Sequence, residues 1–277
     1  MSRSKTPKAG TLKAGAQFTP DTVHTLGLDE LFSLIRSKHV GSWMRSVTVD
    51  TQEFNGWMSF DEARNAAEFG QWSAPEIKTL TLPELTAASD EMRYYYDVCG
   101  EVLDVASFCN GEPEYWQVAE PIQKPIGRVL RFAVEIGGLG DIPAYQLRNR
   151  GEAIIALINS LELQGHSVEI TIVRAYTNSE NQSYKFLIPI KHAGQAIDIK
   201  RLQFIIGHPA FYRRCLFGLT ELAQGKDIHT CGTRTAEYAP DGFIHISHRQ
   251  GLCDEPEDAM QWAKNWADCI AAGHAEN

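Results

Sequence analysis

The order of elements between residues 128 and 190 constrains the fold more than any other feature of the sequence. It begins with the apolar run RVLRFAVEI at 128–136, which has the length of a strand and lacks the alternation of a strand with one solvated face. A helix is then predicted from Gly151 to Gly165, because apolar residues recur there at helical spacing, namely Ile154, Leu157, Ile158 and Leu161. A strand followed by a helix of this kind is typical of a parallel sheet.

Two more strands follow, VEITIVRAY at 168–176 and YKFLIPI at 184–190, and only the polar turn 178–182 separates them. A connection this short predicts an antiparallel hairpin. Pro189 has no N–H for a ladder hydrogen bond, so its strand is expected at a sheet edge. We therefore predict an α/β fold with a mostly parallel sheet, helices on both faces and an antiparallel edge hairpin, plus a mixed helical N-terminal segment.

We divide the chain into three parts. Residues 1–20 are expected to form a flexible basic arm, because the first seventeen positions contain no acid and four basic residues, Arg3, Lys5, Lys8 and Lys13. Residues 21–125 are expected to be a mixed, mainly helical segment, and residues 126–277 an α/β domain.

Several helices are predicted on local signals. Residues 28–35 present one apolar face, and Ser59 with Glu62 can form a capping box for a helix that stops at Gly70. Near the end of the chain, the pattern predicts a helix, a short strand and a last helix, at 209–224, 242–247 and 256–272.

Composition narrows the class of protein. The chain has 43% hydrophobic residues and no apolar run near membrane-spanning length, so we expect a globular protein without a membrane segment. Its net charge of −9 disfavours binding of a nucleic-acid phosphate backbone to the body of the protein. The basic arm is a local exception to this charge. The arm lacks the apolar core of a signal peptide, which predicts a cytoplasmic location. The six cysteines have no CxxC spacing, and we expect them to be free thiols.

The element order over residues 128–272 resembles the von Willebrand factor A domain, whose second and third strands form the same antiparallel edge hairpin. In that family the first strand ends in Asp-x-Ser-x-Ser, whose oxygens hold a divalent cation. The corresponding stretch here, EIGGLGD, runs from Glu135 to Asp141 and has no hydroxyl side chain. Glu135 and Asp141 leave room for a rebuilt oxygen cage, but a glycine-rich turn without a metal is our prediction.

A second resemblance lies in YDVCGEVLDVASFCNGEPEYW at 96–116 and SFDEARNAAEFGQW at 59–72. These stretches look like those of a group of uncharacterised phage and prophage proteins. The resemblance implies a mobile-element setting and brings no activity with it.

Two groups of charged residues are candidate binding sites. The first consists of four carboxylates within eighteen residues, which suit Mg²⁺ or acid–base chemistry but more often cap helices and turns: Asp97, Asp104, Glu112 and Glu114. The second consists of arginines near predicted strand ends or helix starts, which suit phosphate but more often pair with surface acids: Arg148, Arg150, Arg174, Arg213 and Arg214.

Residues of the types that bind zinc gather between positions 229 and 253, namely His229, Cys231, His245, His248 and Cys253. Strand alternation places His245 and His248 on opposite faces, which predicts that they do not share a site. Aromatic residues suited to base stacking are expected mostly in the core: Tyr94, Tyr95, Tyr96, Trp43, Trp57, Trp72 and Trp116. The motifs GxxxxGK(S/T), GxSxG and HExxH are absent from the sequence.

The leading hypothesis is a non-enzymatic binding or adaptor protein of a phage or mobile element, which contacts a protein partner through loops at the carboxyl edge of the sheet. The first alternative is a cofactor of phage transcription or replication that binds single-stranded nucleic acid through the arm, the arginines and exposed aromatics. The second is a metal-dependent hydrolase that uses the carboxylates between 97 and 114. No cofactor is expected, and the oligomeric state stays open.

Overall fold

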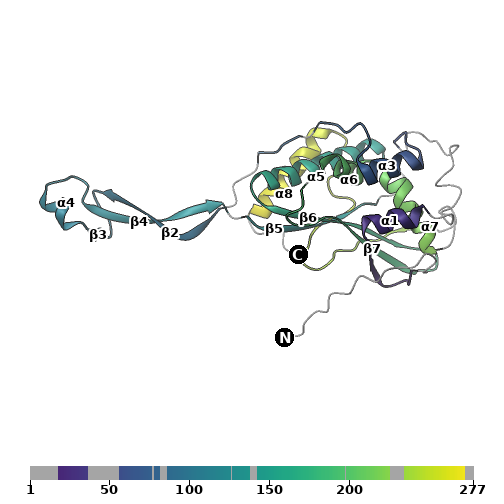
Figure 1. Ribbon diagram of the computed structural model, residues 1–277, viewed down its shortest axis with the longest axis horizontal. Helices are drawn as coiled ribbons and strands as arrows, with labels where there is room; N and C mark the ends of the chain where they lie inside the picture. Colours follow the sequence, from purple (N-terminus) through teal and green to yellow (C-terminus); the bar gives the residue numbers. More distant parts are fainter. Residues whose placement is uncertain are drawn as a thin grey trace.

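The structure is a computed structural model that describes residues 18–36, 56–76, 78–81, 86–125, 127–137, 142–196, 198–224 and 234–271. Figure 1 shows a mixed α/β body from which a long antiparallel hairpin projects. None of the helices in these ranges is long and apolar enough to cross a membrane.

A six-stranded, mostly parallel sheet forms the centre of the body, in the order β1-β7-β6-β5-β9 with β8 beside β6. β5 pairs in parallel with β6 and β9, and β6 pairs antiparallel with β7, so the predicted crossover and hairpin are confirmed. The strands are β1 (Val23–Thr25), β5 (Val129–Glu135), β6 (Ser167–Thr177), β7 (Ser183–Lys191), β8 (Arg234–Thr235) and β9 (Ile244–Ile246).

β7 is not the outermost strand, which corrects the expected edge position. The short strand β1 pairs in parallel with Lys185 to Leu187. It stops short of Pro189, which lies opposite Thr171 beside a shift in the β6–β7 register. The proline therefore still sits where no second neighbour needs its missing N–H.

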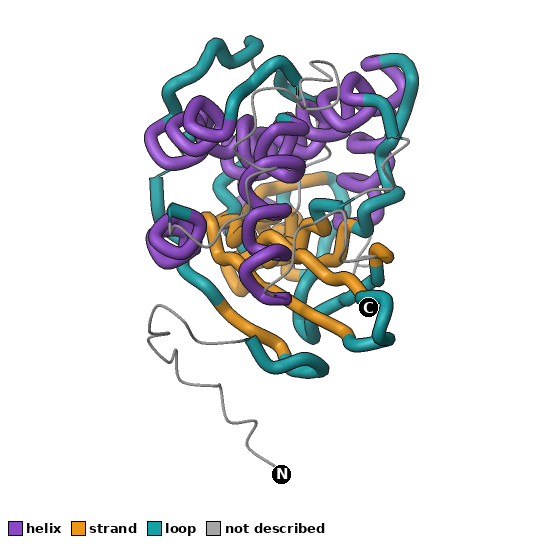
Figure 2. The backbone as a smooth tube through the Cα atoms, turned by 90° about the vertical axis from the view of Figure 1, so that its right-hand side faces the viewer, coloured by secondary structure: helices purple, strands orange, loops and turns teal. Residues whose placement is uncertain are grey.

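The helices contact one another in the succession α8, α5, α6, α3, η1, α7 and α1. Figure 2 shows these helices on one side of the sheet. Their buried side chains join one core with residues of the sheet such as Leu130, Phe132 and Ile170. The helices are α1 (Leu28–Ile35), α3 (Phe60–Phe69), α5 (Ala144–Leu163), α6 (Ile199–Gly207), the π-helix η1 (Phe211–Leu216), α7 (Phe217–Gln224) and α8 (Pro256–Ala271).

The expectation of helices on both faces of the sheet is therefore wrong for the described residues. On the opposite face, Arg131 and Glu169 form an ion pair at 2.8 Å with the arginine side chain 56% exposed. The segment after β8 also crosses this face, where the ammonium of Lys185 lies 5.0 Å from the centre of the Tyr238 ring. Ala133 and Val173, which alternate with the polar positions of this face, are buried, so this segment and not a helix covers part of it.

The N-terminal part is only partly helical. The helices predicted at 28–35 and 59–70 are confirmed, including the reciprocal capping box of Ser59 and Glu62 and the left-handed Gly70. Phe18, within the predicted arm 1–20, is buried against Phe186 and belongs to the core. Positions 1–17 of that arm lie outside the described residues.

Residues 86–125, part of the segment expected to be mixed and mainly helical, form mostly strands. The long strands β2 (Thr86–Asp97) and β4 (Trp116–Pro125) pair antiparallel, and β3 (Val102–Leu103) with helix α4 (Val105–Cys109) forms the tip. Side chains from both faces of β2 near the tip are exposed, so no apolar alternation marks it as a strand in the sequence. We call residues 86–125 the hairpin arm.

Candidate functional site

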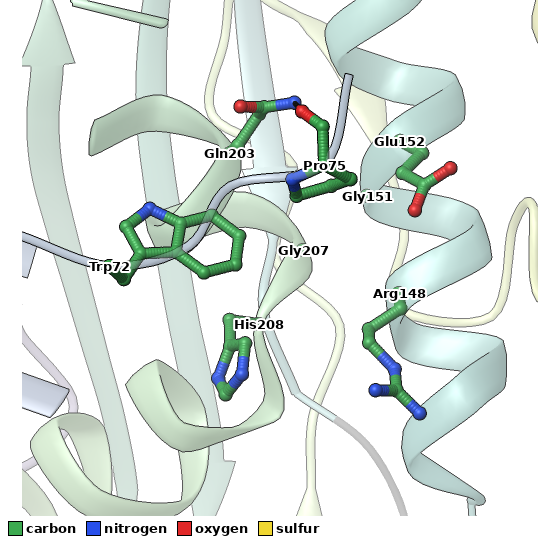
Figure 3. A pocket seen from close by; sticks show the side chains of 8 residues that line it. All are labelled: Trp72, Pro75, Arg148, Gly151, Glu152, Gln203, Gly207 and His208. Atoms are coloured by element: carbon green, nitrogen blue, oxygen red, sulfur yellow. Dashed lines mark hydrogen bonds between the residues drawn. The ribbon is translucent and has the colours of Figure 1, made fainter. Parts of the chain in front are cut away.

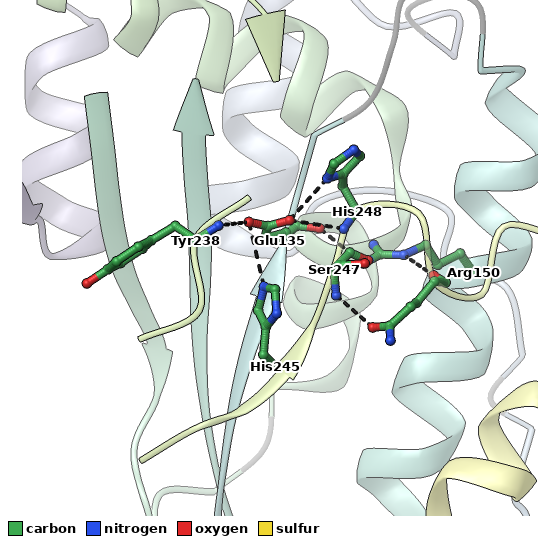
Figure 4. A network of polar contacts seen from close by, with 7 residues as sticks. Glu135, Arg150, Tyr238, His245, Ser247 and His248 are labelled. Atoms are coloured by element: carbon green, nitrogen blue, oxygen red, sulfur yellow. Dashed lines mark hydrogen bonds and ion pairs between the residues drawn. The ribbon is translucent and has the colours of Figure 1, made fainter. Parts of the chain in front are cut away.

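Glu135 ends β5, at the carboxyl edge of the sheet where ligands of α/β proteins commonly bind. Its side chain is buried, and both of its carboxylate oxygens accept backbone hydrogen bonds. Oε1 accepts from the N–H of Tyr238 at 2.6 Å, and Oε2 accepts from the N–H of His248 at 3.2 Å (Figure 4). The carboxylate therefore fastens the segment that follows β8 to the end of β5.

Two histidines converge on the same carboxylate. Nδ1 of His248 lies 3.1 Å from Oε2, and Nε2 of His245 lies 3.6 Å from Oε1 (Figure 4). The prediction that these histidines do not share a site is wrong, because β9 ends at Ile246 and the chain turns at once, with Gln250 N–H donating to Ser247 O. Strand alternation applies only while the strand continues.

The surroundings of Glu135 favour its ionised form. Burial by itself raises the pKa of a carboxyl group, but contacts from His245 and His248 and the two backbone N–H groups outweigh it and lower the pKa of Glu135 to about 2. The group is therefore a carboxylate throughout the neutral range. A carboxylate against an imidazole also fixes which ring nitrogen carries the proton.

Arg150 of α5 reaches the backbone beside this carboxylate and is buried as well. Its Nη2 donates to the backbone oxygens of Glu135 at 3.0 Å and Ser247 at 3.1 Å, and its Nε donates to the oxygen of Gln250 at 2.8 Å. Burial lowers the pKa of Arg150 to about 10 against the opposing effect of Glu135. We call Glu135, Arg150, His245 and His248 the rim network, since together they join the strand end to the turn 247–250.

The rim network does not form a metal cage. Among the residues that the structure describes, no group of three or more histidine, cysteine, aspartate or glutamate side chains is placed to hold a metal ion. Asp141, His229 and Cys231 lie outside the described residues. Cys253 is half-buried, and its carbonyl accepts from Asn149 Nδ2 at 3.2 Å.

The other candidate arginines are buried within the body, except for one. Arg213 and Arg214 are buried and donate to the backbone oxygens of Ile142 at 2.7 Å and Met58 at 3.3 Å. Arg174 is buried between the rings of Tyr176 and Tyr212, 4.9 and 5.1 Å from their centres. The exception is Arg148, which is exposed on α5 and lines a pocket.

The four candidate carboxylates lie on the hairpin arm and are not gathered around one point. Asp104 is the N-cap of α4 and accepts from the N–H groups of Ala106 and Ser107, which lowers its pKa. Asp97 accepts from the N–H of Val98 at 2.6 Å. Glu112 and Glu114 are exposed in the turn before β4.

The aromatic candidates separate into two groups. Contrary to the expectation of a core position, Tyr94, Tyr95 and Tyr96 are 62%, 38% and 47% exposed on the hairpin arm, and Trp57 is 69% exposed. Trp72 and Trp116 are half-buried, and Trp43 lies outside the described residues. Sequence periodicity misses the exposed tyrosines because two-stranded pairing buries neither face.

Residues 27–240 match a family model described as "Domain of unknown function (DUF7192)". No curated protein and no solved structure matches the chain.

Proposed function

The chain belongs to this family of unknown function, and from its geometry we propose that it is a non-enzymatic binding protein that contacts a partner protein through the hairpin arm. The observation that carries the proposal is the apolar surface of the arm's tip. Val98, Val105 and Phe108 are 63%, 62% and 53% exposed, next to the exposed tyrosines of β2. Clustered apolar side chains of this size at a projecting tip are typical of contact surfaces.

The marginal stability expected of the hairpin arm also supports a partner at its tip. A two-stranded hairpin is marginal in water by itself, and β2 has its main contacts with β4. Within the described residues, no element of the body makes a comparable set of contacts with either strand. Covering the tip with a partner would remove apolar surface from water, which is worth roughly 25 cal/mol per Å².

The charge of the tip defines the partner further. Residues 96–116 contain five acids and neither lysine nor arginine; the acids are Asp97, Glu101, Asp104, Glu112 and Glu114. A complementary surface is a protein groove with an apolar floor and lysine or arginine at its rim. The side chains of the rim network, by contrast, contact one another and the backbone of the same chain. We therefore move the proposed partner contact from the carboxyl-edge loops to the hairpin arm.

The same acids argue against the nucleic-acid alternative. The exposed tyrosines on β2 offer stacking faces, which is the observation in its favour. A strand of phosphates beside five carboxylates without a basic residue would be repelled, however. A metal-dependent hydrolase finds no support in the described carboxylates, since Asp104 serves as a helix cap.

Two finer statements belong to this proposal. Within the sheet, β5 has β6 and then β7 on one side and β9 on the other, in the order β7-β6-β5-β9. With β5 counted along the chain as the first strand of the α/β part, this order supports a von Willebrand factor A-like arrangement. The motifs at 59–72 and 96–116 support a mobile-element protein that acts in the host cytoplasm.

Site-specific photo-crosslinking tests the proposed contact. A photo-reactive phenylalanine analogue at position 108 is expected to crosslink a partner protein in cells, whereas the same analogue at Leu163, which is 71% exposed on α5, is not. Val105→Asp should lower the crosslinking at position 108 by about tenfold, because it puts a charge into the apolar contact. Leu163→Asp is the matched control and should leave it unchanged.

The identity of the crosslinked segment decides between the alternatives. A partner peptide with lysine or arginine beside apolar residues supports the proposal. Equal crosslinking from positions 108 and 163, crosslinking only to a second copy of the chain, or salt-sensitive binding of oligonucleotides through the arm would each overturn it.

A further inference from the structure

The outer edge of strand β2 is open along its last residues. Within the described residues β2 pairs only with β4, and this pairing runs without interruption from Met92 to Asp97. Figure 1 shows both strands extending away from the body, so the described elements of the body do not cover this edge. An open edge presents unpaired backbone N–H and C=O groups, which pair readily with a strand of another molecule.

Hydrogen bonds near the tip show which backbone groups of β4 face β2. On the side of β3, the carbonyl oxygens of Tyr115 and Gln117 accept from the N–H groups of Asp104 at 2.9 Å and Glu101 at 3.1 Å. Neighbouring residues of an antiparallel strand direct their backbone groups to opposite sides. The even-numbered residues of β4 therefore bond to β2, and the odd-numbered residues face away from it.

The same alternation identifies the groups on the open edge of β2. The residues that pair with positions 116, 118 and 120 of β4 are Asp97, Tyr95 and Arg93. These three residues use their backbone N–H and C=O groups for hydrogen bonds to β4. Met92, Tyr94 and Tyr96 alternate with them, so the N–H and C=O groups of these residues point outward.

The opposite edge of the arm is less open to such pairing. There β3 covers Trp116 and Gln117 of β4. Farther from the tip, the odd-numbered positions that face this edge include Pro121, which lies opposite Met92 and has no N–H to donate. A short covering strand and a proline are common means of blocking a strand edge. β2 contains no proline, so its edge is the better one for another strand.

The stretch RYYYD at 93–97 is complementary to itself when two copies run antiparallel. With Tyr95 opposite Tyr95 of the second copy, Arg93 of each copy lies opposite Asp97 of the other. Tyr94 and Tyr96 then form the hydrogen-bonded pairs, as their outward backbone groups require. Arg93 and Asp97 fall in non-hydrogen-bonded pairs, in which opposite side chains approach most closely. The register therefore places opposite charges together at both ends of the paired stretch.

Both charges are available for this contact. Arg93 is exposed, and its guanidinium has no hydrogen bond or ion pair within the described residues, although Glu120 lies opposite it in β4. Asp97 accepts a hydrogen bond from the N–H of Val98 through Oδ1 at 2.6 Å, and its Oδ2 has no partner among the same residues. Four strand positions separate Arg93 from Asp97 by about 13 Å, so the two cannot pair within one chain.

We propose that two copies of the chain form a dimer by antiparallel pairing of the outer edges of β2. The dimer joins both hairpin arms in one sheet around a twofold axis at Tyr95. A parallel pairing would set Arg93 against Arg93 and Asp97 against Asp97, whereas the antiparallel one also points the two acidic tips in opposite directions. Val105 and Phe108 lie outside the paired stretch, so the dimer is an interaction beyond the proposed partner contact.

Sedimentation velocity of the full chain over a range of concentrations tests the dimer. The paired stretch is short, so we expect a weak dimer with a Kd on the order of 10 μM. Arg93→Asp and Asp97→Arg each turn both ion pairs into repulsive ones, and each should raise the Kd by about tenfold.

An equimolar mixture of these two variants is the sharpest measurement. In the mixed pair, the two acids of one variant lie opposite the two arginines of the other. The mixture should therefore dimerise about as strongly as the unchanged chain, and so should the double variant Arg93→Asp/Asp97→Arg, in which the charges are exchanged. A contact in another register or through another surface gives no such recovery.

Proline variants test the strand edge itself. Tyr94→Pro removes an outward N–H of β2 and should abolish the dimer. Ala119→Pro is the matched control, since Ala119 lies opposite Tyr94 and its N–H points to the other edge of the arm. A chain that stays monomeric up to about 1 mM would overturn the proposal. So would undiminished dimers of the single charge variants, a mixture no more dimeric than its components, or equal effects of the two prolines.

Discussion

Glu135 illustrates how far a single residue can be interpreted from sequence. Its place at the end of the first long strand was predictable from the apolar run before it. The glycine-rich turn predicted behind it falls largely outside the described residues. The partners of Glu135 were not predictable, because His245 and His248 meet it only after β9 has ended and the chain has turned. Contacts between segments a hundred residues apart leave no local pattern.

The low pKa of Glu135 predicts a pH-dependent contribution to stability. The pKa is about 2 in the folded protein and 4.5 without the fold, so the stabilisation is complete above pH 4.5 and is lost as pH falls through 2. Glu135→Gln should lower the free energy of unfolding by about 3 kcal/mol at pH 7 and by about half as much at pH 3.

Urea unfolding of the variant at the two pH values checks this expectation. Glu169→Gln removes a carboxylate from a more exposed ion pair on the sheet and should cost no more than about 1 kcal/mol. A Glu135→Gln effect of the same size at both pH values would show that the carboxylate charge is not the cause.

At the scale of elements, helices with local start and stop signals were the most predictable. α1 and α3 begin and end as the sequence indicates, whereas α5 begins at Ala144, seven residues before the predicted start at Gly151. Gly151 marks the close contact with Gly207 and not a helix start. A glycine required by a neighbouring helix cannot be distinguished from a boundary glycine in one sequence.

The crossing of α5 and α6 gives a prediction at this scale. Gly151→Ala places a methyl group in the backbone of Gly207, so the helices must separate, at a cost of roughly 1–3 kcal/mol. Thermal unfolding should show a lowered melting temperature. Gly27→Ala is the control, since its added Cβ meets nothing within 4 Å; equal effects of the two changes would contradict a tight crossing.

At the scale of the whole molecule, the sequence predicts the central sheet but neither the hairpin arm nor the single layer of helices. The crossover, the β6–β7 hairpin and the last strand follow from patterns of burial, and each leaves a signature in apolar residues. The hairpin arm leaves none, because its described side chains near the tip are mostly exposed and its pairing is local. The single helical layer was also missed, since a strand buried by loops looks like one buried by helices.

Removal of the arm tests whether the body is independent of it. Replacing residues 86–125 with a short Gly/Ser linker should leave the body folded, because the arm's main contacts are between its own strands. The melting temperature should stay within a few degrees of that of the full chain, and the unfolding transition should stay cooperative. Aggregation or loss of cooperative unfolding would show that the body depends on the arm.

The hairpin arm projects well beyond the outline of the body (Figure 1). A large partner held at its tip therefore stays clear of the small pocket that Trp72, Arg148 and His208 line beside α5 and α6 (Figure 3). One copy of the chain can thus hold a partner at a distance without steric conflict with its own helices.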